Sequence, residues 1–439
     1  MDIEGYARQG LIKGDPEIEE KLATRITEIK QVDMTIARKL AQAAISEARA
    51  ILDVSGDILT STRSGVTMGQ FGVGSRGSGD FYAHEKIAEV IGSTAAVVDS
   101  SHLDDSGVVR TQSGEYIVLT VDGIHSRLSD FPFLAGFHVA RASLRDVYVM
   151  GARPLALFSD IHVADDGDVA KIFDHIAGIT TVSQVTGIPL ITGSTLRIGG
   201  DMVIGDRMTG GVGAVGVTEN LTSRNLTQPG DLILMTEGAG GGTISTTALY
   251  YGMHDVVDET INVKFIQACE ALLESDVIKH VHSMTDVTNG GIRGDAKEIC
   301  KTAGIGMEFN EASIRPLVNP RVFEMLDLLD IDYLGVSLDS LLITVPQEYA
   351  DEVIGVVQSS GVAIDVIGKV VKGHGAKIKV GDELRDFSPS FRESAYTPIK
   401  KMIGEDNPRD FDEMKKAIDI AAEKAIEKKR KVIEILDKK

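Results

Sequence analysis

The sequence predicts an α+β protein of two domains that carries an added helical segment at each end. Short β-rich runs, glycine turns and amphipathic helices alternate from Ser55 to about Thr218, which is the pattern of a mixed domain. The following polar stretch TENLTSRNLTQPG contains Pro229 and separates two apolar blocks, so it predicts a domain boundary. The second block repeats the character of the first. The predicted units are residues 1–55, 56–218, 230–398 and 399–439.

The N-terminal unit is predicted to contain one long helix over residues 17–53. Its apolar residues recur at three- and four-residue steps and form one stripe, which must dock on another surface. The stripe consists of Ile18, Leu22, Ile26, Ile29, Ile36, Leu40 and Ala44. In the first domain, β-rich composition predicts strands at 94–99, 116–121, 155–161 and 211–217.

The second domain is predicted to have the same mixed character. Its strands are expected at 231–236, 305–309, 340–345 and 362–370, and its helices at 261–275, 293–303 and 320–329. The last forty residues are rich in Lys and Glu and keep a helical apolar register, which predicts a solvated amphipathic helix. An interaction tail is the alternative.

Composition limits the classes of partner. The formal net charge of the 439 residues is −20, and this argues against a nucleic-acid or anionic-membrane partner. An anionic substrate would need local neutralisation. The chain has no apolar run of membrane-spanning length and no signal-peptide layout, so a cytoplasmic location is expected. Cys269 and Cys300 lie in helix-like stretches and are expected to be small buried hydrophobes.

Four aspartates in three separated segments indicate a site. Asp104 and Asp105 precede a β-rich pair, Asp122 ends the run 116–121, and Asp146 lies in RDVYVMGARP. Two like charges about 4 Å apart repel by roughly 1 kcal/mol in water and about 4 kcal/mol when partly buried. Converging aspartates therefore require a cation, and oxygen-only ligands favour Mg²⁺. The alternative is that each aspartate merely caps a turn or helix.

Three glycine-containing loops could bind phosphate. Residues 69–80 (GQFGVGSRGSGD) offer free backbone N–H groups, although a flexible linker has the same composition. Residues 237–243 (EGAGGGT) lie between a strand and a helix-like run, which is a good arrangement for an anion. In residues 285–299, Asp286 precedes a double glycine and a helix, where helix capping also explains it.

Read in order, nine segments resemble the aminoimidazole ribonucleotide (AIR) synthase superfamily over about residues 60–372. They are DDSGVV, LTVDGIHSR, RDVYVMGARPLALFSD, GIPLITGSTLRI, TGGVGAVGVTE, PGDLILMTEGAGGGT, TDVTNGGIRGDAKEI, VSLDSLLITVP and VIGKVV. The superfamily also contains formylglycinamidine ribonucleotide synthases, selenophosphate synthetase, thiamine-monophosphate kinase and the hydrogenase-maturation protein that dehydrates a carbamoyl group.

The resemblance implies a fold, an assembly and a set of ligands. The N-terminal mixed sheet, of four strands, would pair with that of a second subunit in a homodimer, with the ATP sites at the interface and an α/β sandwich as the C-terminal domain. The residues implied to hold Mg²⁺ are Asp104, Asp105, Asp122 and Asp146. Those implied to bind ATP are Gly72, Gly74, Gly77, Gly79, Arg145, Gly240, Gly241, Gly242 and Asp286.

Departures from the family pattern narrow the chemistry. The first cysteine is Cys269, which excludes selenide activation, and the ending IEILDKK lacks the cysteine that carries a carbamoyl group. Many members have an acidic residue or histidine after the third strand, but this chain has Thr192-Gly193-Ser194-Thr195, with Asp201 or Asp206 as substitutes. Arg145 precedes Asp146 in place of the usual asparagine, where it could contact an anion or form a surface salt bridge.

Two functions follow from these observations. The first is an ATP- and Mg²⁺-dependent enzyme that phosphorylates or activates an oxygen of a small-molecule substrate, by positioning and electrostatics. The second is an ATP-binding regulatory or assembly protein without turnover, suggested by Ser194 and by the terminal helices. Within the first class, a kinase and an amide-to-amidine ligase or cyclase both remain open, and no catalytic residue is assigned.

Overall fold

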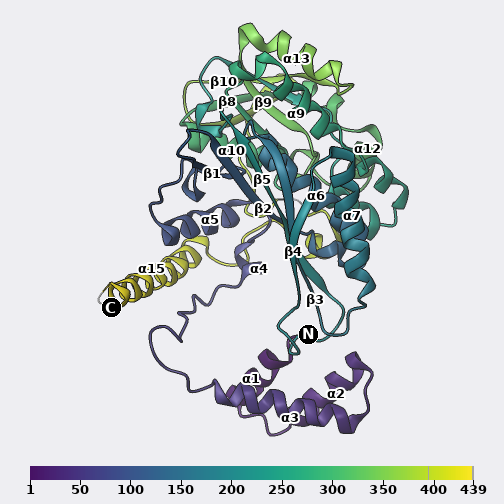
Figure 1. Cartoon of the computed structure of the whole chain (residues 1–439), viewed down its shortest axis with the longest axis vertical. Coiled ribbons are helices and arrows are strands. Elements are labelled where there is room, and N and C mark those ends of the chain that lie inside the picture. Colours follow the sequence, from purple (N-terminus) through teal and green to yellow (C-terminus); the bar gives the residue numbers. More distant parts are fainter. Residues whose placement is uncertain (394, 438–439) are drawn as a thin grey trace.

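The computed structural model describes residues 1–393 and 395–437 and confirms an α+β protein built around two mixed sheets (Figure 1). The first sheet has the strand order β1-β2-β5-β3-β4, in which β3 and β4 run parallel and the other neighbours antiparallel. Its strands are β1 (Gly107–Arg110), β2 (Tyr116–Gly123), β3 (Arg153–Val163), β4 (Leu190–Arg197) and β5 (Met208–Thr218). The described residues thus form five strands in this sheet, one more than the resemblance implied.

The predicted strand at 94–99 is wrong. Val98 makes only an isolated bridge to Val108, and Asp99 ends the extended run because its side chain accepts a hydrogen bond from the Ser101 backbone N–H. A side chain that bonds the nearby backbone competes with the strand ladder. The first strand of the sheet is therefore β1, which directly follows Asp104 and Asp105.

Helices α6 (Pro132–Tyr148) and α7 (Ala170–Thr186) cover one face of this sheet. Leu144 on α6 packs in a common core with Leu157 and Val212 of the sheet. The two helices approach closely because of glycines: a Cβ at Gly136 would lie 2.1 Å from a carbonyl oxygen of α7. Only glycine, which has no side chain, allows two backbones to approach this closely. The same helix contacts the second domain along its length, from His138, which bonds Ser245, to Tyr148, which bonds Glu270.

The second sheet has the order β12-β11-β8-β10-β6-β9-β7. Its strands are β6 (Asp231–Thr236), β7 (Ser283–Asp286), β8 (Gly306–Asn310), β9 (Leu341–Pro346), β10 (Ile364–Val371), β11 (Gly375–Val380) and β12 (Glu383–Asp386). The helices of this domain are α8 (Gly242–Tyr250), α9 (Lys264–Glu274), α10 (Gly291–Ala303), α11 (Glu311–Ile314), α12 (Pro320–Leu328) and α13 (Ala350–Ser359). All four predicted strands and all three predicted helices of this domain are present. Both cysteines are buried and unpaired, as predicted.

The predicted single helix over 17–53 is wrong, because the N-terminal segment is a bundle of three helices. They are α1 (Ile3–Lys13), α2 (Ile18–Lys30) and α3 (Met34–Ala50). Gln31 adopts a left-handed conformation with φ of 55°, and Asp33 caps α3 by accepting from the Thr35 and Ile36 N–H groups. The break rotates the apolar stripe, so that Ile36 is 45% exposed while Ala37 is fully buried.

The bundle attaches to two loops of the first domain, the one between β4 and β5 and the one between β3 and α7. The Ile3 N–H donates to the Met202 carbonyl, and Lys30 forms ion pairs of 2.6 Å with both Asp165 and Asp166. Residues 51–66 then run as an exposed connection without helix or strand to the rest of the chain. The bundle lies apart from the two sheets in Figure 1.

The C-terminal segment returns to the start of the first domain. Short α4 (Met68–Phe71), the glycine-rich segment and α5 (Ser78–Ile91) are contacted by residues before and within α14 (Pro398–Ile403) and α15 (Phe411–Leu436). Arg392 donates to the carbonyls of Gly69 and Gln70 at 3.0 Å, and Phe411 packs on Phe71 with ring centroids 5.6 Å apart. The start of α15 is therefore part of the folded body. Among the described residues, no helix is long and apolar enough to cross a membrane.

Candidate functional site

A cleft of about 940 Å³ lies where the two domains meet. Its walls come from the glycine-rich segment, the end of β2, helix α6, the N-terminus of α8, the loop after β7, and the C-terminal segment. It collects most of the residues predicted from sequence. Those lining the cleft are Gly74, Asp104, Asp105, Asp122, Arg145, Asp146, Gly241, Gly242 and Asp286.

The other four predicted glycines do not line the cleft. A Cβ at Gly77 would lie 2.1 Å from the Phe391 carbonyl oxygen, and one at Gly79 would lie 1.9 Å from that of Phe71. Gly72 ends α4 with φ of 71°, and Gly240 has φ of 75°. In this structure these glycines allow close backbone packing and tight turns. These four glycines therefore support the fold around the cleft and do not line the cavity.

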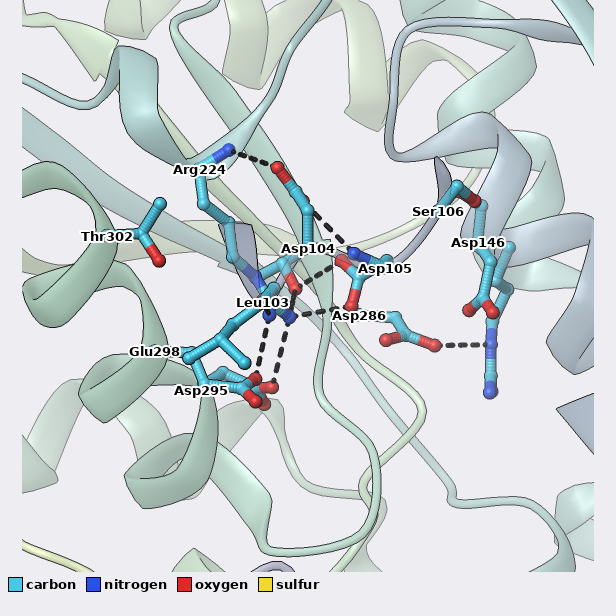
Figure 2. Close-up of polar contacts among 12 residues, drawn as sticks. Leu103, Asp104, Asp105, Ser106, Asp146, Arg224, Asp286, Asp295, Glu298 and Thr302 are labelled. Atoms are coloured by element: carbon cyan, nitrogen blue, oxygen red, sulfur yellow. Dashed lines mark hydrogen bonds and ion pairs between the residues drawn. The ribbon is translucent and has the colours of Figure 1, made fainter. Parts of the chain in front are cut away.

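An arginine that the sequence did not single out organises the acidic wall (Figure 2). Arg224 is 1% exposed and forms ion pairs with Asp105 at 2.6 Å and with Glu298 at 2.7 Å. Its backbone N–H donates to Asp104. Thr285 donates its hydroxyl to the other Asp105 oxygen at 2.7 Å. Two of the four aspartates are therefore held by the segment that the sequence marks as a domain boundary.

The glycine-rich segment is held to the same wall. Asp80 accepts from the backbone N–H groups of Gly74 at 2.9 Å and of Arg76 at 2.7 Å. The Arg76 side chain reaches Asp295 and Glu298 on α10 at 3.2 and 2.9 Å. These two acids lie in the quoted segment TDVTNGGIRGDAKEI, one helical turn apart on α10, but their role depends on arginines distant in sequence.

Arg145 is buried at the centre of the cleft, so the interpretation as a surface salt bridge is wrong. It is 5% exposed and pairs with Asp286 at 3.0 Å and with Asp339. Arg141, one turn earlier on α6, pairs with the same Asp339. Asp286 is the last residue of β7 and does not cap α10, whose N-cap is Gly290 without a side-chain hydrogen bond. Both residues thus belong to one buried ionic network.

Burial and mutual repulsion disfavour the ionised form of three carboxylates of the cleft. Burial, opposed by Arg224 and reinforced by repulsion from Asp286, raises the pKa of Asp105 to about 7. Burial also raises the pKa of Asp122 to about 6 and that of Asp146 well above its ordinary value. A divalent cation would offset this repulsion, so the donor set fits Mg²⁺.

The aspartates nevertheless do not form a ready-made metal centre. Within residues 1–393 and 395–437, no three His, Cys, Asp or Glu side chains are grouped so that they could hold one ion. Asp146 accepts from the Thr120 hydroxyl at 2.8 Å, while Asp105 is turned toward Arg224. Metal binding would therefore require at least one of these carboxylates to change partner. The four-aspartate site stays a prediction.

The opposite wall carries two histidines next to α8. His125 bonds Thr246 at 3.1 Å through Nδ1 and Tyr396 at 2.9 Å through Nε2. His138 bonds Ser245 at 2.8 Å through Nε2. Burial lowers the pKa of His125 to about 4 and that of His138 to about 3, so both rings are neutral at pH 7. Single histidines gave no spacing signal in the sequence.

The altered third-strand motif lies outside the cleft. Ser194 is exposed on the edge strand β4. The suggested substitutes are paired elsewhere, because Asp201 contacts Arg197 and Asp206 contacts Lys171 at 3.0 Å. Neither aspartate lines the cleft. In this structure they do not replace the acidic residue or histidine that many family members have there.

Relatives of the chain fall in one superfamily. The chain is 52% identical over 450 residues to an uncharacterized protein of Methanocaldococcus jannaschii, covering 99% of this chain and 98% of that protein. It is 27% identical to the phosphoribosylformylglycinamidine synthase subunit PurL of Methanobrevibacter smithii, covering 64% of this chain and 39% of that one. It is 30% identical to a selenide, water dikinase of Myxococcus xanthus, covering 47% and 58% of the two chains.

Solved structures share the fold. The hydrogenase maturation protein HypE in complex with ATP matches with a TM-score of 0.55 and 18% identity, over 71% of this chain and 96% of that one. AaThiL complexed with AMPPCP and TMP matches with a TM-score of 0.53 and 16% identity, over 70% and 96% of the two chains. These likenesses establish the architecture of both domains.

Family models cover most of the two-domain body. Residues 103–218 match the N-terminal domain of AIR synthase related proteins, and residues 228–381 match the C-terminal domain. The relatives named as synthase subunit and dikinase are members of the same superfamily. The chain therefore belongs to the AIR synthase-related family.

Proposed function

We propose that this protein is an ATP- and Mg²⁺-dependent enzyme that transfers phosphate to, or activates, an oxygen of a small molecule. One observation carries the proposal: six aspartates from five separate segments line a single cleft that also contains buried arginines and a glycine-rich wall. Family membership supports it, because the fold-related HypE and ThiL structures hold ATP and AMPPCP.

The acidic wall would hold the metal, and the glycine-rich segment would face the nucleotide phosphates. Asp104, Asp105, Asp122 and Asp146 are the residues that would bind Mg²⁺, which supplies charge neutralisation to a transferring phosphoryl group. Arg145 is fixed by two carboxylates and keeps its place without a ligand. Such a preorganised cation stabilises developing negative charge without reorganisation cost.

Binding without turnover is the second candidate, and one observation favours it. The third-strand motif lacks its acidic residue or histidine, and neither Asp201 nor Asp206 reaches the cleft to replace it. A protein of this kind would bind ATP through the same aspartates and release no ADP. The two candidates therefore share a binding site and differ in turnover.

Calorimetry and ADP release separate these possibilities. The purified chain should bind ATP only with Mg²⁺, and a small-molecule extract should stimulate ADP release that Asp146→Asn abolishes. Asp382→Asn is the control, because Asp382 is exposed at the turn between β11 and β12. ATP binding without extract-dependent ADP release would favour the regulatory role. Absence of ATP binding would reject both candidates.

We also propose that the protein is a homodimer through the open face of the first sheet. The face opposite α6 exposes apolar side chains, with Val109 at 41%, Leu119 at 42% and Val121 at 72%. A second copy would cover them, and a stable interface of this kind buries more than about 1,000 Å². Sedimentation should give a dimer at micromolar concentration, and Val121→Glu should shift it toward monomer. A wild-type monomer would contradict the proposal.

A further inference from the structure

Two cations face the cleft without a carboxylate partner. Among the described residues, neither Arg127 nor Lys400 forms an ion pair; Arg127 stacks on Tyr250 at 4.0 Å, and Lys400 lies over Tyr396 at 4.2 Å. Both lie close enough to His125 to lower its pKa, after burial as the largest cause. In a chain with a net charge of −20, unpaired cations gathered in a cleft indicate an anionic ligand.

The N-terminus of α8 borders the same part of the cleft. This helix has nine residues, and its Gly241 and Gly242 line the cavity. The N-cap Gly241 makes no side-chain cap, so the first N–H groups lack the partner that a capping residue would provide. A Cβ at Gly241 would lie 3.7 Å from His138 Nδ1 and 3.8 Å from an Arg141 nitrogen. Asp339 Oδ1 lies 4.0 Å from the same point, but this carboxylate is paired with Arg141 and Arg145, so the helix end faces one histidine and one neutralised ion pair.

His138 provides an independent sign of a missing ligand. Its ring is 6% exposed, and Nε2 is bonded to Ser245, but Nδ1 has no hydrogen-bond partner among the described residues. A buried polar atom without a partner destabilises the fold, so such atoms are rare unless a ligand or water satisfies them. The neutral ring can place its proton on Nδ1 and donate to an anion there.

The C-terminal segment places Lys400 in the cleft beside His125. Tyr396 is 4% exposed and bonds His125 at 2.9 Å, and the Thr397 hydroxyl accepts from the Lys400 backbone N–H. Burial lowers the pKa of Lys400 to about 8, while Asp80 opposes this shift, so the ammonium remains largely charged at pH 7. These residues follow position 381, where the match to the family's C-terminal domain ends.

We propose that the N-terminus of α8, His138, Arg127 and Lys400 form a subsite for an anionic group, a carboxylate or phosphate monoester, of the small molecule that the proposed ATP-dependent reaction consumes. The inference rests on the proposed function for the identity of that molecule as acceptor. The aspartate wall repels an acceptor anion and attracts the metal with its nucleotide phosphates, so the acceptor's anion binds at the cationic end. This assigns Gly241 and Gly242 to the acceptor rather than to ATP.

The test measures binding of inorganic phosphate to the full chain by calorimetry, with and without saturating Mg²⁺ and AMPPCP. Lys400→Met and Arg127→Met should each weaken phosphate binding by about tenfold or more, because each removes a charge-assisted contact. Lys401→Met is the matched control: it is the next residue on α14, and its ammonium contacts the Leu329 carbonyl outside the cleft. It should leave phosphate binding unchanged.

A second variant tests the helix end without removing a charge. Gly241 has φ of −136°, and an added Cβ would meet its neighbours only at ordinary contact distances of 3.7–4.0 Å. The methyl group of Gly241→Ala, placed between the helix end and His138, should weaken phosphate binding, and the unfolding midpoint of the variant is measured alongside as the control for folding. Wild-type phosphate affinity in both Lys400→Met and Gly241→Ala would overturn the subsite.

The measurements with Mg²⁺ and AMPPCP show whether phosphate occupies the site of the acceptor or that of the nucleotide. Phosphate should bind equally well in the presence of Mg²⁺ and AMPPCP if the subsite belongs to the acceptor. Competition between phosphate and AMPPCP would overturn the acceptor assignment and give the subsite to the nucleotide's terminal phosphate. Phosphate binding that depends on Lys400, together with no AMPPCP binding, would support the anion subsite while rejecting the proposed ATP-dependent function.

Discussion

Asp122→Asn should weaken the binding of Mg²⁺ with ATP and, at the same time, stabilise the ligand-free protein. Asp122 lies at the end of β2 in the cleft, where Asp286 repels it and Arg145 attracts it. Asparagine keeps the shape of the side chain and removes the charge. The two effects have opposite signs because the negative charge of Asp122 binds the metal when it is present and lowers the stability of the folded protein when it is absent.

The expected loss of affinity is tenfold or more, which corresponds to roughly 1.4 kcal/mol. Removing one of few charged ligands from a hard divalent cation produces a loss of at least this size. The loss should appear only in the presence of Mg²⁺. Without the metal, neither wild type nor variant should bind the nucleotide, because the remaining aspartates repel its phosphates.

The expected gain in stability follows from the pKa of Asp122. Burial raises this pKa from the ordinary 3.8 to about 6, which corresponds to at most roughly 3 kcal/mol. The side chain keeps some contact with solvent, so we expect about 1–2 kcal/mol. Because the pKa is higher in the folded than in the unfolded state, wild-type stability falls as pH rises from about 4 to about 6. The variant lacks this loss and is the more stable protein above pH 6.

Calorimetry with AMPPCP and urea unfolding in a chelator measure the two effects. The unfolding free energies of wild type and variant should differ at pH 7 and converge below about pH 3, where Asp122 is protonated in both the folded and the unfolded state. Asp382→Asn should change neither property. A variant with unchanged nucleotide affinity would remove Asp122 from the site. A variant less stable at pH 7 would refute the view that its charge is uncompensated.

Three further outcomes are expected. Arg224→Met should lower the unfolding free energy by about 3–5 kcal/mol in urea titrations, because it leaves the largely buried side chain of Asp105 without its ion-pair partner. A loss below about 1 kcal/mol would show that the network does not stabilise the fold. The wild-type protein should lose stability as the pH falls from 6.5 to 4, because the pKa of His125 is about 4 in the folded state and higher in the unfolded chain. His125→Asn should remove about 1–3 kcal/mol of this loss. An unchanged dependence of stability on pH would contradict the prediction. Trypsin should cut first after Arg63, because this residue lies in the exposed connection 51–66. Mass spectrometry of the fragments identifies the first cut. Earlier cleavage after Arg76 would contradict the ion pairs of that side chain.

Local patterns in the sequence predicted the elements that are locally specified. In the second domain, β-rich composition located β6, β8, β9 and β10, because short apolar runs bounded by turn residues have few alternatives. The helical period failed at residues 31–33, where one capping aspartate inside a periodic segment was enough to break the helix. The exposed Ile36 shows that an apolar residue in register need not face the core once the register changes.

The sequence by itself determined which residue types are available to the site: aspartates at strand ends, a glycine turn before α8, and a basic residue before Asp146. The order and spacing of these residues along the chain provide that information, and they also indicate the family to which the chain belongs. The sequence also predicted that the acidic residues share one place, and the cleft brings them together.

Only the tertiary structure decided which residues complete the cleft. Arg224 lies 119 positions from Asp105, and Tyr396 lies 271 positions from His125, yet each pair is in hydrogen-bonding contact. Periodicity and motifs describe neighbours along the chain, whereas these contacts depend on how two sheets and the C-terminal segment pack around a shared cavity. The same packing separates Gly74, which faces the cleft, from Gly77, whose missing side chain makes room for another segment's backbone.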